Sequence, residues 1–494
     1  NYENERLTPY LYETDLDDCR MSARLAVSRQ SAVYEITFRC GLPSIALSSA
    51  NGGIRCGDNW VSGWQTVGGN TKVYVYLESE ATPVEAQLLG SGCAVMRYSQ
   101  ATVRLRYGIS YISEDQAKAN LYREIRGYDI DSVATAGRRA WNEALGRIRV
   151  KGGTEDEKTV FYSAYYRTFE RPISMSEDGR YWSAFDGQVH DDGGQPFYND
   201  DWIWDTYRAA HPLRLLTDQQ KEEDIIASYL LMARQMGTGW MPTFPEVNGD
   251  SRRMNSNHGA AMVADALAKG LKVDATAAFE ACRKAIREKT LAPWSGAKAG
   301  RLDAFYRQHG YIPAIREGEP ETDPNVNRLE KRQPVAVTLG TSYDEWCLSR
   351  IADYLSTHAK NKRQASAYAA DARKYLQLSL NYRNLWNADT KFFHPKDSNG
   401  RFIEPFDYRY SGGQGAREYY GENNGWTYRF DVQHNIPDLI DLMGGNEAFA
   451  KAMDQSFTEP LGESKFDFYS HLPDHTGNVG MRSEERRVGK ECRS

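Results

Sequence analysis

The hydrophobic period of this sequence changes near Ser113, and that change limits the fold more than any other feature. Upstream, apolar and polar residues alternate in short β-branched runs separated by Gly- and Ser-rich turns. The runs are Arg24–Val27, Ala32–Phe38, Lys72–Leu77 and Ala101–Tyr107. Such alternation is typical of strands that bury one face. We predict that residues 1–112 form a β-sandwich, incomplete because its first strands are missing.

From Ser113 onward the apolar residues recur at helical spacing. Ser113-Glu-Asp-Gln116 is a capping-box pattern, and it precedes the helical run Ala117–Ile125. A second helix is expected over Ile130–Ile148. We predict that these two helices form a linker over residues 113–150.

Residues 151–481 are expected to form a helical domain, an incomplete (α/α) barrel. The predicted helices are Thr154–Phe169, Thr217–Met236, Ala260–Leu271, Thr276–Lys289, Ser342–His358, Asn361–Trp386 and Trp426–Leu442. Thr217-Asp-Gln-Gln220 is another capping-box pattern. Long aromatic loops at residues 176–204, 237–257 and 405–424 separate the helices. Paired helices with such loops at one end indicate a barrel whose loops build a pocket, and the lack of a short-period repeat argues against a solenoid.

Composition and charge limit the classes of binding partner that this chain can have. A chain of 494 residues is too long to fold around one ordinary hydrophobic core, so we expect two or three domains. The 31 Tyr and 11 Trp outnumber 17 Phe, which suits sugar binding, although packing between helices explains the bias equally well. With a net charge of −6 and no basic run before the C-terminal tail, we expect no nucleic-acid partner. No apolar run approaches the roughly 18 residues that span a membrane.

The cysteines and the two chain ends say less about function. The seven cysteines include no Cys-x-x-Cys pair, so we expect buried thiols rather than a zinc site or redox dithiol. The chain opens at Asn1 without a leader, and we expect that a signal peptide has been lost upstream. Residues 482–494 are densely charged without an apolar period. We interpret them as a non-native tail, with a solvated native tail as the alternative.

The segment Tyr420–Tyr428 sets one acid, Glu422, among amides and aromatic rings. A carboxyl group shielded from water there would have a raised pKa and could donate a proton at neutral pH. Glu422 is therefore our candidate general acid. The simpler alternative is a solvated or helix-capping glutamate.

Two further loops carry candidate sugar-binding residues. The turn Asn199–Pro212 contains Trp204, Asp205 and Arg208, and such side chains stack on a pyranose or bind its hydroxyls. Asp205 and Arg208 are equally compatible with a structural ion pair. The second loop contains Trp240 and His258.

Single histidines and acids in these segments are ambiguous. A lone histidine such as His258 more often packs or starts a helix than acts in catalysis, and neither His258 nor His211 belongs to a metal-spaced pair. Asp205, Asp344 and Glu345 are candidates for a catalytic base, and spacing selects none of them.

Together these segments resemble glycoside hydrolase family 92, calcium-dependent exo-acting α-mannosidases common in gut bacteria. The resemblance runs from about Pro9 to Met481. Its most specific stretches are Gly108–Ala117 with Asn120, Phe161–Tyr166, Asp178–Tyr181, Trp204–Arg208 with His211-Pro212, Gly239–Pro242, Ala264–Ala266, Thr338–Cys347 and Gly421–Trp426.

The resemblance implies an N-terminal β-sandwich, a helical linker and an (α/α)6 barrel that cleaves terminal α-mannose from glycans with inversion. Glu422 matches the family's general acid, although Asn424-Gly425 stands where we expect Asn-Ala and Thr427 replaces a Gln. The expected substrate-binding residues are Trp204, Asp205, Thr206, Arg208, Trp240, His258 and Trp426. The resemblance also implies that the protein is located in the periplasm, at the bacterial cell surface or outside the cell.

One expected part of the family pattern is missing. A Gly-Asn-Glu-Pro segment with sugar- and calcium-binding roles, and later the aspartate base, should follow the region that matches Pro473–Gly477. We therefore expect the Ca²⁺ ligands mainly in a missing C-terminal part and negligible activity from the polypeptide as written. The alternatives are another inverting (α/α)6 glycosidase or a non-catalytic carbohydrate-binding fragment.

Overall fold

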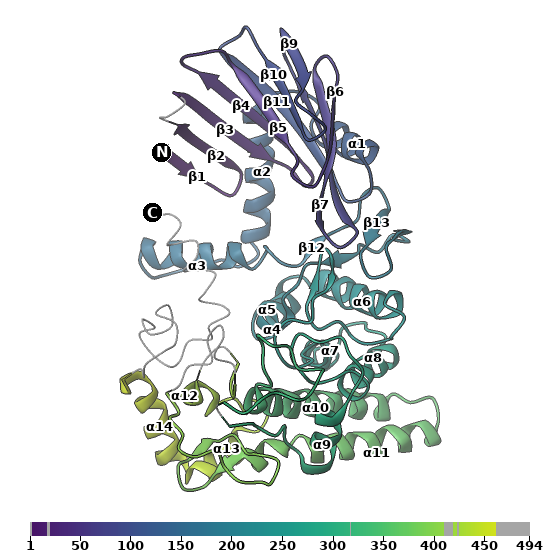
Figure 1. The fold of residues 1–494 in the computed structure, drawn as a ribbon, viewed down its shortest axis with the longest axis vertical. Coiled ribbons are helices and arrows are strands. Elements are labelled where there is room, and N and C mark those ends of the chain that lie inside the picture. The colour runs from purple at the N-terminus through teal and green to yellow at the C-terminus, as the bar shows by residue number, and fades with distance from the viewer. Residues whose placement is uncertain (1, 17–19, 317, 410–417, 422–423, 461–494) are drawn as a thin grey trace. The chain divides into compact units, whose positions relative to one another are not determined.

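The computed structural model describes residues 2–16, 20–316, 318–409, 418–421 and 424–460. Contacts divide the chain into two compact units. The sheet unit contains residues 1–199 and 247–249, and the helical unit contains residues 200–246 and 250–494. Figure 1 shows the elements of each unit. The boundaries expected at residues 112, 150 and 481 stay predictions.

The sheet unit is an antiparallel sandwich. Its large sheet has the strand order β1-β2-β3-β4-β11-β8-β7-β6, and a second sheet has the order β5-β10-β9. The strands are β1 (Tyr2–Leu7), β2 (Leu11–Leu16), β3 (Met21–Val27), β4 (Ser31–Phe38), β5 (Ser44–Ser48), β6 (Gly52–Cys56), β7 (Trp60–Gly68), β8 (Thr71–Ser79), β9 (Glu85–Leu88), β10 (Cys93–Arg97) and β11 (Thr102–Ser110). All four predicted apolar runs fall in strands, namely β3, β4, β8 and β11.

The two sheets share one apolar core. Met96 from the small sheet and Val61, Val103 and Leu105 from the large sheet belong to the same buried cluster. Alternate residues of β10 and β11 enter it, because successive side chains of a strand point to opposite faces. The predicted N-terminal sandwich is confirmed.

Helices α1 (Glu114–Glu124), α2 (Ile130–Leu145) and α3 (Glu155–Arg167) follow the last strand. The predicted cap of α1 is confirmed, because the Ser113 hydroxyl accepts a hydrogen bond from the Gln116 N–H at 3.1 Å. Ala117 and Leu121 of α1 lie in a buried cluster with Val33 of β4. The unit also contains two small two-stranded sheets, one of β12 (Ile173–Ser174) with β15 (Tyr198–Asn199) and one of β13 (Arg180–Ser183) with β14 (Gln188–Asp191).

The helical unit is built from packed pairs of successive helices. Its helices are α4 (Ile203–Thr206), α5 (Ala210–Thr217), α6 (Gln219–Gln235), α7 (Gly259–Ala268), α8 (Ala275–Arg287), α9 (Arg301–His309), α10 (Pro334–Thr357), α11 (Lys362–Leu378), α12 (Gly425–Tyr428), α13 (Ile436–Met443) and α14 (Asn446–Thr458). The short strands are β16 (Pro245–Glu246), β17 (Gly249–Asp250), β18 (Trp386–Asn387) and β19 (Phe392–Phe393). The pairs α5 with α6, α7 with α8, α10 with α11 and α13 with α14 pack together. The predicted helical domain is confirmed.

Three predicted helices have different limits. Helix α10 begins at Pro334, well before Ser342, because its first turns are buried and apolar. The predicted helix over 361–386 ends at Leu378, and a separate 3-10 helix follows. The predicted helix over 426–442 is wrong: α12 ends at Tyr428, and Pro437 lies in the first turn of α13, where its missing N–H costs nothing.

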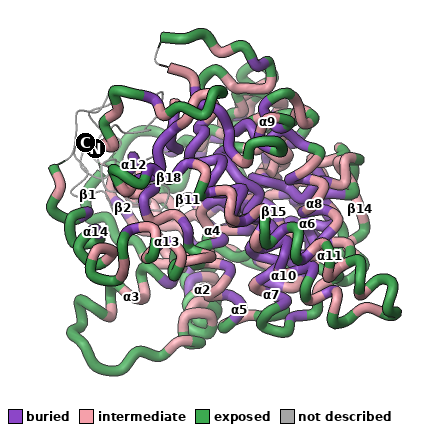
Figure 2. Tube along the Cα trace, turned by 90° about the horizontal axis from the view of Figure 1, so that it is seen from below, coloured by how far each residue is buried: buried purple, intermediate pink, exposed green. Residues whose placement is uncertain are grey.

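The buried part of the helical unit is concentrated on α6, α7, α8 and α10 (Figure 2). Cys282 of α8 and Cys347 of α10 are buried as expected, whereas Cys40 of the sheet unit is exposed. No helix in the described part of the chain combines the length and hydropathy needed to cross a membrane.

Candidate active site

The three loops singled out by the sequence meet inside the helical unit. The rings of Tyr207, from the first loop, and His258, from the end of the second, have centroids 4.1 Å apart. Gly421 of the third loop lies against Asn255, because a Cβ added at Gly421 would be 3.3 Å from the Asn255 Nδ2. Segments far apart in sequence therefore surround one region.

The turn that carries Trp204 is held by the side chain of Asp201, three residues before it. Thr206 closes the short helix α4, and its hydroxyl donates to Asp201 Oδ1 at 2.8 Å. Trp204 is buried against Phe244 and Met254. Thr206, expected to touch the sugar, thus has its hydroxyl hydrogen bonded within the protein, while Trp204 and Asp205 sit on a fixed turn.

Asp201 belongs to a buried charge network that the sequence did not reveal. His211 donates from Nε2 to Asp201 Oδ2 and from Nδ1 to Glu222 Oε1, both at 2.8 Å. Arg214 Nη1 lies 3.1 Å from Glu222 Oε2, and the Tyr229 hydroxyl donates to Asp201. Burial alone lowers the pKa of His211, but the carboxylates of Glu222 and Asp201 raise it to about 9. The resulting imidazolium balances the acids that anchor the Trp204 turn.

Arg208, Tyr207, His258 and Tyr343 form a cluster that we call the ring cluster. The Arg208 guanidinium carbon lies 5.2 Å from the Tyr207 ring centroid and 5.6 Å from the Trp204 ring, while Arg208 itself is exposed. His258 contacts Tyr207 on one side, and Tyr343 lies 5.8 Å from it between ring centroids. Aromatic faces beside an exposed guanidinium can bind both the C–H face and the hydroxyls of a sugar.

Asp344 and Glu345, adjacent on α10, have different environments. Asp344 is fully buried and accepts hydrogen bonds from the Asn257 N–H and from His258 Nδ1. Glu345 accepts from the Tyr306 hydroxyl at 3.1 Å, and burial raises its pKa to about 8. Of these two candidate bases, only Asp344 contacts the ring cluster.

Glu422 lies outside the described residues, so its side chain is not placed. The described residues on both sides of it are anchored. Tyr420 is 1% exposed, and its hydroxyl donates to the Phe393 carbonyl at 2.9 Å. Asn424 caps α12 by accepting the Trp426 N–H at 3.1 Å. The role of Glu422 stays a prediction.

The two remaining candidate tryptophans are buried. Trp426 packs edge-on against Phe392, with ring centroids 5.0 Å apart. Trp240 is 5% exposed, and its indole N–H has no hydrogen-bond partner among the described residues. These observations do not place Trp240 or Trp426 in the ring cluster. The substrate-binding roles of the two tryptophans stay predictions.

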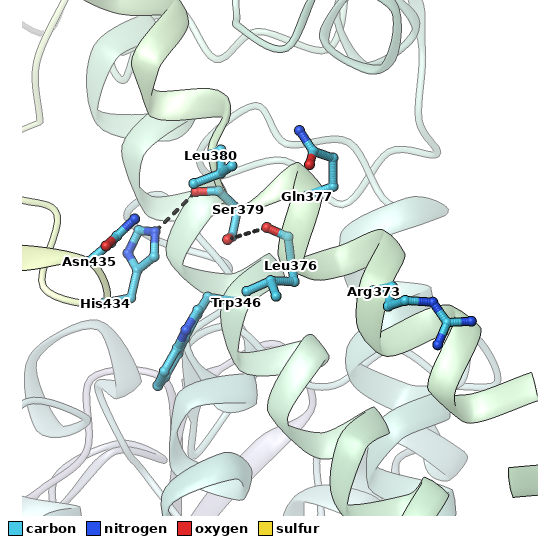
Figure 3. Close-up of a pocket in the computed structure, with 8 residues that line it drawn as sticks. All are labelled: Trp346, Arg373, Leu376, Gln377, Ser379, Leu380, His434 and Asn435. Atoms are coloured by element: carbon cyan, nitrogen blue, oxygen red, sulfur yellow. Dashed lines mark hydrogen bonds between the residues drawn. The ribbon is translucent and has the colours of Figure 1, made fainter. Parts of the chain in front are cut away.

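A cavity of about 330 Å³ lies near the ring cluster. It is lined by Trp346, Arg373, Leu376, Gln377, Ser379, Leu380, His434 and Asn435 (Figure 3). Tyr343 of the ring cluster stacks on Trp346 at 6.1 Å, and His434 Nε2 donates to the Ser379 carbonyl at 3.0 Å. The lining combines an indole and two leucines with amides and a guanidinium.

No group of three or more His, Cys, Asp or Glu side chains suitable for a metal ion occurs in the described ranges. The expected Ca²⁺ stays a prediction.

The fold agrees with comparisons to known proteins. Residues 116–484 match the Glycosyl hydrolase family 92 catalytic domain. Because the match covers most of the chain, this protein belongs to glycoside hydrolase family 92.

Solved structures share the architecture. A family 92 inverting mannosidase from Bacteroides thetaiotaomicron is 26% identical with a TM-score of 0.78, and the match covers 95% of this chain and 63% of that one. A family 92 α-mannosidase from the same organism, in complex with mannoimidazole, is 21% identical with a TM-score of 0.79, covering 94% and 62%. The second likeness concerns the fold alone.

An uncharacterized secreted glycosidase from Arthroderma benhamiae is 26% identical over 381 residues. The match covers 71% of this chain and 41% of that protein. The chain therefore spans less than two thirds of the length of these relatives.

Proposed function

We propose that this chain is the sandwich and much of the catalytic domain of a glycoside hydrolase that removes terminal α-linked mannose from glycans. The observation that carries the proposal is the family match over residues 116–484. The meeting of the three loops around Tyr207, His258 and Asn255 supports it, because it brings the candidate sugar-binding segments together in one region. One structurally similar relative is an inverting mannosidase, which supports the substrate class.

In the proposed reaction, the sugar packs on the ring cluster and Glu422 donates a proton to the glycosidic oxygen as the C–O bond breaks. Water attacks the anomeric carbon from the opposite face, and a base removes its proton. In inverting enzymes these two carboxyl groups stand roughly 6.5–9.5 Å apart. The resemblance puts the base on an aspartate beyond the region that Pro473–Gly477 matches. Arg208 and the fixed Trp204 turn orient the hydroxyls.

The proposal includes assistance by calcium, and this part of it rests only on the resemblance to glycoside hydrolase family 92. A bound Ca²⁺ would hold sugar hydroxyls among its oxygen ligands. The described residues contain no group of three or more His, Cys, Asp or Glu side chains that could hold it. Secretion is proposed because one relative is described as secreted, and a bacterial periplasmic or cell-surface location stays a prediction.

Two measurements test the proposed function. Calorimetry on the chain itself should detect methyl α-mannoside and not methyl α-glucoside. In a protein that extends the chain to the length of its relatives, α-mannobiose should be hydrolysed with inversion, chelators should reduce the rate, and Glu422→Gln should abolish it. Loss of a general acid typically costs about 10²–10⁴-fold.

The outcomes separate the alternatives. Hydrolysis of α-glucosides instead of α-mannosides would support another inverting glycosidase. Binding of mannose without turnover in the extended protein would support a carbohydrate-binding fragment. Full activity in the Glu422→Gln variant would refute the assignment of the acid.

A further inference from the structure

Both oxygens of the buried Asp344 carboxylate accept a hydrogen bond from a neighbouring residue. Its Oδ2 accepts the Asn257 N–H at 2.5 Å, and its Oδ1 accepts His258 Nδ1 at 2.8 Å. Asp344 is 0% exposed and lies on α10, whose other buried residues fix its position. Because both oxygens already accept hydrogen bonds from the protein and the residue is buried from solvent, Asp344 is poorly placed to take a proton from an attacking water. Its geometry is that of a support for another side chain.

The supported side chain is the imidazole of His258, at the start of α7. His258 is 5% exposed, and the Tyr207 ring lies against it at 4.1 Å and 37°. Because Nδ1 carries the hydrogen donated to Asp344, the neutral ring has its lone pair on Nε2. Within the described part of the chain, Nε2 has no hydrogen-bond partner. One ring nitrogen is fixed by the protein, and the other is left for a ligand.

We propose that Asp344 is a positioning residue that holds His258 so that Nε2 accepts a hydrogen bond from a sugar hydroxyl. This inference rests on the proposed function and assigns a role to two residues of its site. A hydroxyl fits because it can donate to Nε2, and the exposed guanidinium of Arg208, which lies against Tyr207 in the same cluster, can donate to other oxygens of a sugar. A cationic ligand would instead be repelled by Arg208.

The test uses the full chain with ¹⁵N-labelled histidine and methyl α-mannoside as the probe. Long-range ¹H–¹⁵N spectra report which ring nitrogen carries the hydrogen, and the spectrum of His258→Gln assigns the resonances. We expect a protonated Nδ1 and an unprotonated Nε2 in the free protein. Adding the mannoside should shift Nε2 while Nδ1 stays protonated.

Variants then test the support. Asp344→Asn should remove the preference for a protonated Nδ1, because an amide cannot accept from both Asn257 and His258. Its affinity for the mannoside should fall about tenfold. Asp353→Asn changes an exposed acid on the same helix, α10, and should leave both the His258 resonances and the affinity unchanged. If Asp344→Asn does not fold, the wild-type spectra and the affinity of His258→Gln decide.

Each outcome has a distinct meaning. A protonated Nε2 and an unprotonated Nδ1 in the free protein would overturn the positioning role, whatever the protein hydrolyses. Mannoside binding that leaves the Nε2 resonance unmoved would overturn the role of His258 while leaving the proposed function intact. The inferred tautomer without any mannoside binding would overturn both the ligand class and the proposed function.

Discussion

His211 shows how a single residue can hold a site without touching substrate. Its imidazole lies between Asp201 and Glu222, and all three side chains are 0% exposed. A buried charge is tolerated only when it is paired and hydrogen bonded, so removing the cation leaves two carboxylates with a large desolvation cost. Asp201 in turn holds Thr206, so stability and the geometry of the Trp204 turn depend on the same residue.

The first prediction concerns this network. His211→Leu should lower the free energy of unfolding of the helical unit by about 3–5 kcal/mol near pH 6, measured by urea denaturation. The contribution of His211 is fully present below the ordinary histidine pKa and is lost as the pH rises through about 9. The destabilisation should therefore shrink at alkaline pH. The matched control, His358→Leu at an exposed position, should stay within about 0.5 kcal/mol of wild type.

The second prediction uses Glu345. Burial raises its pKa to about 8, so the folded protein binds a proton that the unfolded chain has released. Stability then falls as the pH rises from the ordinary glutamate range to about 8. Glu345→Gln cannot ionise and can still accept from Tyr306. Its stability relative to wild type should rise across this pH interval and stay level above it; a difference independent of pH would contradict the prediction.

At the scale of elements, the start of α6 shows how a cap is chosen. The sequence pattern placed the cap at Thr217, but the Thr217 hydroxyl donates to the Leu213 carbonyl and belongs to the end of α5. Asp218 caps α6 instead, because its carboxylate accepts the Lys221 N–H and is negative at the helix N-terminus. Helix α5 ends at Thr217 and α6 begins at Gln219, so the cap of α6 lies at Asp218, one residue later than the sequence pattern suggested.

This correction leads to the third prediction. Asp218→Ala should reduce stability by about 1 kcal/mol, because α6 loses a side-chain acceptor for its first N–H groups. Thr217→Ala removes a hydroxyl that bonds back into α5 and should cost less than half as much. Thermal unfolding of the two single variants compares them directly. A larger loss of stability in Thr217→Ala than in Asp218→Ala would show that Thr217 is the cap, as the sequence pattern suggested.

At the scale of the whole molecule, each unit has its own apolar core. Leu105 lies in the core of the sheet unit, and Leu339 and Phe393 lie in that of the helical unit. Units with separate cores are able to unfold separately. A substitution in one core should therefore act mainly on the transition of its own unit.

Calorimetry of the full chain tests this fourth prediction. Leu105→Ala should cost about 2–5 kcal/mol and lower the transition of the sheet unit. His211→Leu should lower the transition of the helical unit instead. The double variant should show both shifts, because distant sites act additively. A single transition that both substitutions shift equally would show that the units unfold together.

The parts of the site recovered from the sequence are those encoded in short segments. Tyr207 and His258 follow distinctive aromatic and polar runs, so the loops that carry them stood out. The network of Asp201 and Glu222 did not, because its members are separated along the chain and no local spacing links them. Residue types alone could not distinguish Asp344 from Glu345 either, since burial and partners separate their roles.

The sequence by itself determined the sandwich, the succession of helices and the family. The period of hydrophobic residues and the short segments that match the family are local properties of the chain. Only the tertiary structure decided where helices stop and which polar groups meet. Pairings such as Asp344 with His258 depend on long-range packing, which brings distant segments together and removes water from between them.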